Sequence, residues 1–246
     1  MKKTVLGLLF MLLLASVMEA KVLDARYSIS YGVFGQLGIC DAHLETHGNA
    51  YLIEINARTT GIVKRLSGNR QEKYISRGHI EEGMLVSDSF RVRRSHSGKV
   101  ETKIYEIDHQ TQKVTKTTVK KKKGKVYGRS SKILDFYSKD DLLTLYFNLP
   151  SKVTLLLPKT YELTAVGAEK QGGKVTVIVP PAKAYPRYEK MLGKGDFSYL
   201  TAIVYQKLFE SNRGELMLAI GKDGIAQKAV LKDLILYGDL KAVRIK

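Results

Sequence analysis

Hydrophobic and polar residues alternate along most of the chain, and glycine, asparagine and aspartate interrupt the alternation at short intervals. In YLIEINAR, residues 51–58, Tyr51, Ile53 and Ile55 would share one face while Glu54 and Asn56 share the other, which predicts a half-buried strand. The run ICDAHLET precedes it across a His-Gly-Asn turn, so residues 38–58 are predicted to form a hairpin. Further strands are predicted at residues 25–34, 71–78, 83–94, 99–107 and 112–121.

One segment, YSKDDLLTLYFNLP at residues 137–150, has helical spacing instead. Its apolar positions recur at intervals of three and four and form one stripe: Leu142, Leu145, Tyr146 and Leu149. We expect Ser138 to cap the helix and Pro150 to stop it, and we expect the stripe to pack on a sheet.

The second half of the chain returns to strand-like runs. They lie at residues 152–157, 160–169, 174–180, 201–210, 214–220 and 229–245. The Asp-Gly turn at residues 221–224 separates two of them, while residues 197–209 also fit helical spacing, so strand and helix both stay open there. The fold class predicted is mainly β: a curved antiparallel sheet forming a partial barrel with one short packed helix, in a single domain over residues 21–246.

The N-terminus has the layout of a secretory signal peptide, with Lys2 and Lys3 ahead of an apolar run and the small residue Ala20 after it. The run at residues 4–18 would span about 22 Å as a helix, short of the roughly 30 Å hydrocarbon core of a bilayer. We therefore expect residues 1–20 to be cleaved near Ala20, with a site at Ala25 competing. The predicted location is the periplasm, with no membrane span after cleavage; the alternative is an inner-membrane anchor formed by an uncleaved N-terminus.

The net charge of the chain predicts a class of binding partner. The chain has 41 Lys and Arg against 24 Asp and Glu, a formal net charge of +17. In a cytosolic protein this balance would suggest nucleic acid, but after export the available polyanions are anionic lipid, lipopolysaccharide and acidic envelope glycans. A basic surface that serves only solubility is the alternative interpretation. Cys40 is the single cysteine, which excludes an internal disulfide.

Several stretches together resemble the bacterial domain of unknown function 3108. They are YSISYGVFGQLGICDAHLE, the strand ending ARTTG, the strand YEID, the helix DDLLTLYFNL and the close GKDGIAQKAVLKDLILYGDLKAVRI. This resemblance covers nearly the whole chain after residue 20 and implies an exported, β-rich cell-envelope protein with no established activity. The expected curved sheet is similar, more loosely, to the half-barrel carriers that move lipoproteins across the periplasm.

Basic residues on alternating strands are the candidate binding site for an anion or amphiphile, because guanidinium groups bind phosphate in a bidentate manner. The predicted site residues are Arg58, Lys64, Arg65, Arg91, Arg93, Lys120, Lys121, Lys122 and Lys123. The four consecutive lysines are expected at the end of one strand and in its turn to the next. There they would form either a solvated hairpin tip or a contact with an anionic envelope surface.

Metal and catalytic motifs are weak in this sequence. Asp41, His43, Glu45 and His47 would share one strand face, and His43 and Glu45 are the weak metal candidates, but neighbours two apart on a strand lie about 6.6 Å from each other and cannot converge on one ion. We interpret His79, His96 and His109 as surface residues. No nucleophile, HExxH or phosphate-loop motif is present, so no metal, cofactor or catalytic residue is predicted.

The leading hypothesis is therefore a non-enzymatic envelope factor that binds an amphiphile or an anionic envelope polymer. A structural or scaffolding role is the first alternative, in which exposed sheet edges pair with an envelope protein. The second is an envelope hydrolase that uses Asp41, His43 or Glu45.

Overall fold

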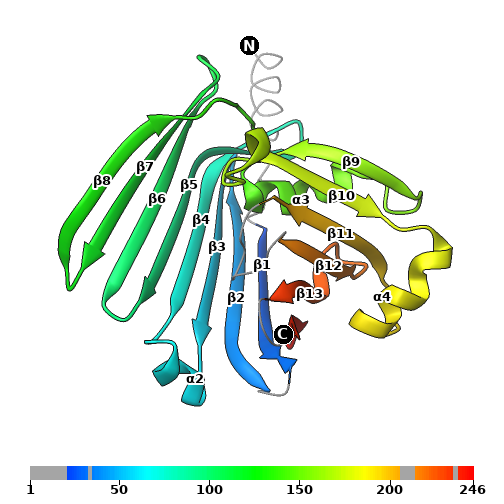
Figure 1. Ribbon diagram of the computed structural model, residues 1–246. Helices are drawn as coiled ribbons and strands as arrows, with labels where there is room; N and C mark the ends of the chain where they lie inside the picture. The colour runs from blue at the N-terminus through cyan, green and yellow to red at the C-terminus, as the bar shows by residue number, and fades with distance from the viewer. Residues whose placement is uncertain (1–20, 33–34, 206–213, 235–237) are drawn as a thin grey trace, which may run out of the picture.

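A computed structural model of the protein describes residues 21–32, 35–205, 214–234 and 238–246. The predicted signal peptide, residues 1–20, lies outside the described residues. A single antiparallel sheet of 14 strands runs through the described part of the chain (Figure 1). The predicted fold class, mainly β with a curved antiparallel sheet that forms a partial barrel and carries a packed helix, is confirmed: the sheet is not closed and helices are few.

The first eight strands form a meander in which each strand pairs with the next. Their bounds are β1 Val22–Tyr31, β2 Gln36–His47, β3 Ala50–Thr59, β4 Gln71–Glu81, β5 Met84–His96, β6 Lys99–Asp108, β7 Lys113–Lys122 and β8 Lys125–Ile133. The predicted hairpin at residues 38–58 is confirmed, with Ile53 of β3 opposite Leu44 of β2. Two-residue alternation located β2 to β7 correctly because one face of these strands is more buried than the other, whereas β8, which is exposed along nearly its whole length, was not among the predicted strand ranges.

The remaining six strands form a second meander. Their bounds are β9 Lys159–Thr164, β10 Lys174–Val179, β11 Ser198–Val204, β12 Glu215–Ile220, β13 Ala226–Leu234 and β14 Gly238–Arg244. The last strand returns to the first: β14 pairs with β1, with Arg244 opposite Tyr27. The two meanders therefore join in the middle of the sheet, and β8 and β9 are its two outer edges (Figure 1).

Three α-helices and two 3-10 turns accompany the sheet among the described residues. They are α2 Gly61–Leu66, α3 Leu142–Lys152, α4 Tyr185–Leu192, η3 Gln171–Gly173 and η4 Ala182–Ala184. None of the helices in this part of the chain is long and apolar enough to cross a membrane.

The central helix α3 lies between the two halves of the sheet, and we call the sheet face that it covers the inner face (Figure 1). Leu145 and Leu149 pack into one cluster with Leu200 and Leu218 of the second meander. Leu143, on the other side of the helix, packs with Ile53, Phe90 and others in the first meander. One helix thus supplies core side chains to both halves.

Both predicted ends of α3 are corrected. The N-cap is Asp141, whose Oδ1 accepts from the backbone N–H groups of Leu143 at 2.7 Å and Thr144 at 3.0 Å. Ser138 stands before the helix and donates to the Thr164 carbonyl instead. Pro150 lies inside the last turns of the helix rather than beyond them, and its missing N–H removes one i→i−4 hydrogen bond there.

In the second half one predicted strand is absent and two predicted strands have other bounds. Residues 152–157 form the end of α3 and a turn instead of a strand, because Val153 closes the helix by donating to the Leu149 carbonyl. The predicted strand at 160–169 ends at Thr164, and the run 229–245 is two strands that pair with each other. At residues 197–209 the strand occupies Ser198–Val204, and residues 206–213 lie outside the described residues.

The outer face of the second meander is covered by α4, which the sequence did not predict. Tyr188 and Leu192 of this helix pack against Tyr199, Met217 and Val230. Tyr199 and Met217 alternate with Leu200 and Leu218, which face α3, so both faces of these strands are buried. The first meander has no such cover among the described residues, and its outer face carries mostly polar and charged side chains.

Candidate functional site

A groove lies on the inner face of β4, β5 and β6, beside α3. Cross-strand register places Tyr74, Val92 and Lys103 in one row and Phe90 and Tyr105 in another, so these side chains share the inner face. They line a cavity of about 390 Å³ together with Arg94 of β5, Leu142 of α3 and three residues after β9, Gly167, Glu169 and Lys170. We call this cavity the inner groove.

The floor of the inner groove is aromatic. The rings of Phe90 and Tyr105 stack with centroids 5.8 Å apart, and both side chains are buried. The segment after β9 passes directly over Phe90 at Gly167, which has a φ of +97°. A Cβ at that position would lie 2.6 Å from the Phe90 ring, so only glycine lets the chain pass this close.

Glu169 binds two lysines from different strands at the edge of the groove. Its Oε1 accepts from the Nζ of Lys103 at 2.6 Å, from the Nζ of Lys116 at 2.7 Å and from the Tyr105 hydroxyl at 3.0 Å. Burial alone would raise the pKa of this carboxyl, but the two ammonium groups outweigh burial and lower its pKa to about 2. Glu169 is therefore ionised at neutral pH and forms ion pairs with both lysines.

A second carboxylate, Glu72, is buried on the same face. It accepts from Arg70 at 2.8 Å, from Arg94 at 3.2 Å and from the Tyr74 hydroxyl. Burial and the neighbouring Glu72 charge raise the pKa of Tyr74 above its ordinary value, so the phenol remains a donor. Arg94 thus belongs to both the Glu72 cluster and the lining of the inner groove.

A smaller cavity of about 160 Å³ lies on the other side of Glu72. It is largely apolar and is lined by Ile29, Leu37, Gly38, Ala57, Arg58, Thr59, Arg70, Glu72 and Leu240. Glu72 lines this cavity, while its partners Tyr74 and Arg94 line the inner groove. Apolar surface therefore lies on both sides of one buried, charged cluster.

The sequence-predicted basic residues do not meet in one site. Arg58 and Arg93 line a shallow outer-face cavity of about 270 Å³ with Lys73, and Arg58 pairs with Asp41 at 2.8 Å. Arg91 lies two positions from Arg93 on the same face of β5, opposite the side that carries the inner groove.

The other predicted residues gather at one end of the sheet. Lys64 and Arg65 belong to α2, Lys120, Lys121 and Lys122 end β7, and Lys123 is in the turn to β8. Neighbouring turns connect them, since the Ser97 N–H donates to the Gly68 carbonyl at 2.7 Å and the Lys123 N–H to the Gly98 carbonyl at 2.8 Å. We call Lys64, Arg65 and Lys120–Lys123 the basic rim.

The weak metal candidates lie on the outer face of β2. His43 Nδ1 is 2.8 Å from Asp24 Oδ1, and its Nε2 is 3.6 Å from Glu45 Oε2. The hydrogen bond with Asp24 raises the pKa of His43, which favours an ion pair. Asp41 is held separately by Arg26 at 2.5 Å and by Arg58.

Comparison with known proteins gives no family. No protein-family model matches this chain, and no curated protein matches it. Among solved structures, it is similar to the crystal structure of a beta-barrel-like protein of domain of unknown function 1849 from Brucella abortus. The TM-score is 0.48 and the identity 12%, over 91% of this chain and 95% of that chain. The barrel-like sheet expected from the sequence is present, whereas membership of the domain of unknown function 3108 family is not shown.

The inner-groove cations are not predicted from the sequence because adjacent basic residues point to opposite faces of a strand. Arg93 is predicted on a polar face, whereas Arg94 continues the buried series Phe90 and Val92 at a spacing of two residues. Lys103 continues the series Tyr105 and Ile107 in the same way. The sequence signal for such a cation is a charged residue at a position that the two-residue alternation assigns to the apolar face.

Proposed function

We propose that the protein is an exported, non-enzymatic envelope factor that binds an amphiphile with an anionic head group in the inner groove. The observation that carries this proposal is the composition of the groove: an aromatic and aliphatic floor bordered by Arg94, Lys103 and Lys170. Ligand sites of this kind are mostly apolar with a few placed polar groups, and their volumes start at about 300 Å³.

The apolar part of the ligand would lie against Phe90, Val92 and Leu142. Each methylene group removed from water contributes about 0.8 kcal/mol, so even a short acyl segment would bind measurably. The apolar cavity beyond Glu72 offers a second stretch of the same inner face for a longer chain.

The anionic part would meet cations that are already positioned. Lys103 is held by Glu169 and Arg94 by Glu72, so neither side chain loses much conformational freedom on binding. Lys170 is exposed at the edge of the groove and has no ion pair among the described residues, so its charge is available to a head group.

Palmitoyl lysophosphatidylglycerol is a suitable probe, titrated into the delipidated mature protein by calorimetry at low salt. Arg94→Ala should weaken binding about tenfold, because a charge-assisted contact contributes about 1.5 kcal/mol or more. Arg93→Ala is the matched control: it removes the neighbouring guanidinium from the outer face and should leave affinity unchanged. A wild-type protein that takes up no probe, or equal losses in the two variants, would reject the groove as the site.

Export is part of the same proposal. Cell fractionation, combined with N-terminal sequencing of the purified protein, should find the chain in the periplasm beginning near Lys21. An intact N-terminus in the inner-membrane fraction would instead support the anchored alternative.

A second candidate function rests on the outer edge of the sheet. The edge strand β8 exposes three large hydrophobic side chains: Val126 at 57%, Tyr127 at 61% and Ile133 at 61%. Its outer backbone groups have no neighbouring strand in the described sheet, and such edges accept a strand from a partner protein. Crosslinking in cells should capture one dominant envelope protein with the wild type and not with Val126→Lys/Tyr127→Lys if this function holds.

A further inference from the structure

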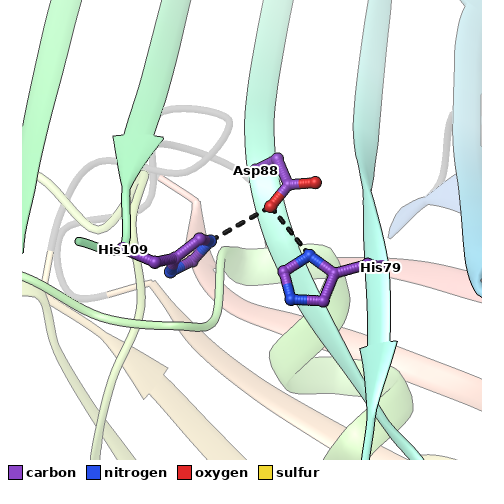
Figure 2. Close-up of side chains that lie close together, drawn as sticks. All are labelled: His79, Asp88 and His109. Carbon is purple, nitrogen blue, oxygen red and sulfur yellow. Dashed lines mark hydrogen bonds and ion pairs between the residues drawn. The ribbon is translucent and has the colours of Figure 1, made fainter.

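Two histidines and an aspartate lie together at the end of the sheet where β4 ends and β5 begins (Figure 2). Asp88 Oδ1 is 2.9 Å from His79 Nδ1 and 3.1 Å from His109 Nε2. The three ligand atoms all lie within 4.8 Å of one another, and among the described residues no other group of His, Cys, Asp or Glu meets this condition. The three side chains come from β4, β5 and the turn after β6.

A β-bulge directs Asp88 toward the two rings. Arg77 of β4 pairs with Ser89 of β5, but the next residue, Gly78, pairs with Ser87, so Asp88 has no partner in β4. The extra residue turns its side chain out of the regular alternation, which is a common use of bulges near functional sites. Gly78 makes the bulge possible, since a Cβ there would lie 1.9 Å from the Val86 carbonyl oxygen.

The ring of His109 is held from both sides. The carboxylate of Asp108 accepts from the N–H groups of Gln110 at 2.9 Å and Thr111 at 3.0 Å, which fixes the turn that begins with His109. The Tyr137 hydroxyl is 2.8 Å from His109 Nδ1, on the opposite side of the ring from Asp88. A hydrogen bond to the second ring nitrogen is the usual support for a metal-binding histidine, because it sets the tautomer and the orientation.

We propose that His79, Asp88 and His109 bind a divalent transition-metal ion with the ligand preferences of zinc. Imidazole nitrogen and carboxylate oxygen are the donors that Zn²⁺ takes at about 2.0–2.2 Å, and in a tetrahedral site such donors lie about 3.3 Å from each other. The observed 2.9 and 3.1 Å are close to this spacing, so small side-chain movements would admit the ion.

Three protein ligands leave one coordination position, and all three side chains are partly exposed, so water would occupy it. The ion would also have a structural consequence. It would connect β4, β5 and the turn after β6 directly, and through Tyr137 it would reach the segment that leads into α3. Metal binding should therefore stabilise the fold.

The test uses the untagged mature protein, stripped with EDTA and titrated with zinc chloride by calorimetry. The wild type should bind one zinc ion per chain. His79→Gln and His109→Gln should each weaken binding at least about 100-fold, and Tyr137→Phe about tenfold, through loss of ring support. Zinc should raise the melting temperature of the wild type and leave both histidine variants unchanged.

His43→Gln is the matched control, because His43 also lies on an outer strand face beside two carboxylates. It should bind zinc as the wild type does. Melting curves recorded in EDTA establish that each variant is folded before its affinity is compared. Any of three results would overturn the proposal. The wild type binds no zinc, or both His79→Gln and His109→Gln bind zinc with wild-type affinity, or His43→Gln loses as much affinity as they do.

Discussion

The pKa values of two carboxylates, Glu169 and Asp141, shift in opposite directions because their hydrogen-bond partners differ. Glu169 is partly exposed and accepts from two lysines, which lower its pKa to about 2 against the effect of burial. Asp141 is fully buried and accepts from hydroxyl and backbone N–H donors instead, so burial dominates and raises its pKa to about 6. Their contributions to stability must therefore change with pH in opposite directions.

Glu169→Gln should lower stability at neutral pH by about 1 kcal/mol, a value reduced for solvent screening because the side chain is about one-third exposed. A lowered folded-state pKa gives stability that is present above the ordinary carboxyl value and lost as pH falls toward 2. Urea unfolding at several pH values should show the difference between wild type and variant shrinking below about pH 4.5. Glu106→Gln, on the outer face of β6, is the control and should give no such trend; a constant difference for Glu169→Gln would contradict the argument.

For Asp141→Asn, the difference in unfolding free energy between wild type and variant should change with pH in the opposite direction. The asparagine oxygen still caps α3, but the variant has no buried charge to form. The folded-state pKa of Asp141 is raised, so this group stabilises the wild type at pH values below its ordinary pKa near 4. That stabilisation is lost as the pH rises toward 6. Relative to the variant, the wild type should lose roughly 2 kcal/mol between pH 4 and pH 6 in urea unfolding. A flat difference across this range would show that Asp141 stays ionised throughout.

At the scale of elements, the bulge in β5 depends on one residue of β4. A methyl group at Gly78 would contact the Val86 carbonyl oxygen, the Asp88 N–H and the Tyr51 ring, so the two strands must separate or the bulge must move. Gly78→Ala should therefore cost about 2 kcal/mol in thermal or urea unfolding and should also weaken zinc binding, because Asp88 leaves its position.

Gly128→Ala is the control for this substitution. Its Cβ would lie 3.7 Å from the nearest atom, an ordinary contact on the edge strand β8, so stability and zinc binding should both stay at the wild-type values. If Gly78→Ala behaves in the same way as Gly128→Ala, the bulge tolerates a side chain and does not fix Asp88.

Alternation identified elements well where a strand has one dry and one wet face, as in β2 to β7. It failed where that contrast is absent. The run at 152–157 is apolar, yet Leu156 is 87% exposed in a turn, because the helix before it extends to Lys152. The histidine cluster was harder to predict than the strands. His79, Asp88 and His109 are brought together by strand register and by a β-bulge, and no local pattern in the sequence reveals either.

At the scale of the molecule, the three candidate functional surfaces lie on different parts of one open sheet. The inner groove lies beside α3, the histidine cluster at the end where β4 and β6 finish, and the basic rim at the opposite end of those strands. The rim also presents Ile62 and Leu66 of α2, which are 78% and 81% exposed and lie one helical turn apart. Apolar tips flanked by cations suit an anionic membrane surface.

The basic rim should therefore bring the protein to anionic vesicles independently of the inner groove. Each cation near such a surface contributes about 1 kcal/mol, and salt screens the attraction over about 10 Å at 0.1 M. Replacing Lys120–Lys123 with serine should weaken cosedimentation with phosphatidylglycerol vesicles at least tenfold at low salt, and the difference should vanish at high salt. Arginine at the same four positions keeps the charge and should retain binding, while both variants should bind palmitoyl lysophosphatidylglycerol as the wild type does. If the serine variant sediments normally at low salt, these lysines only keep the hairpin tip solvated.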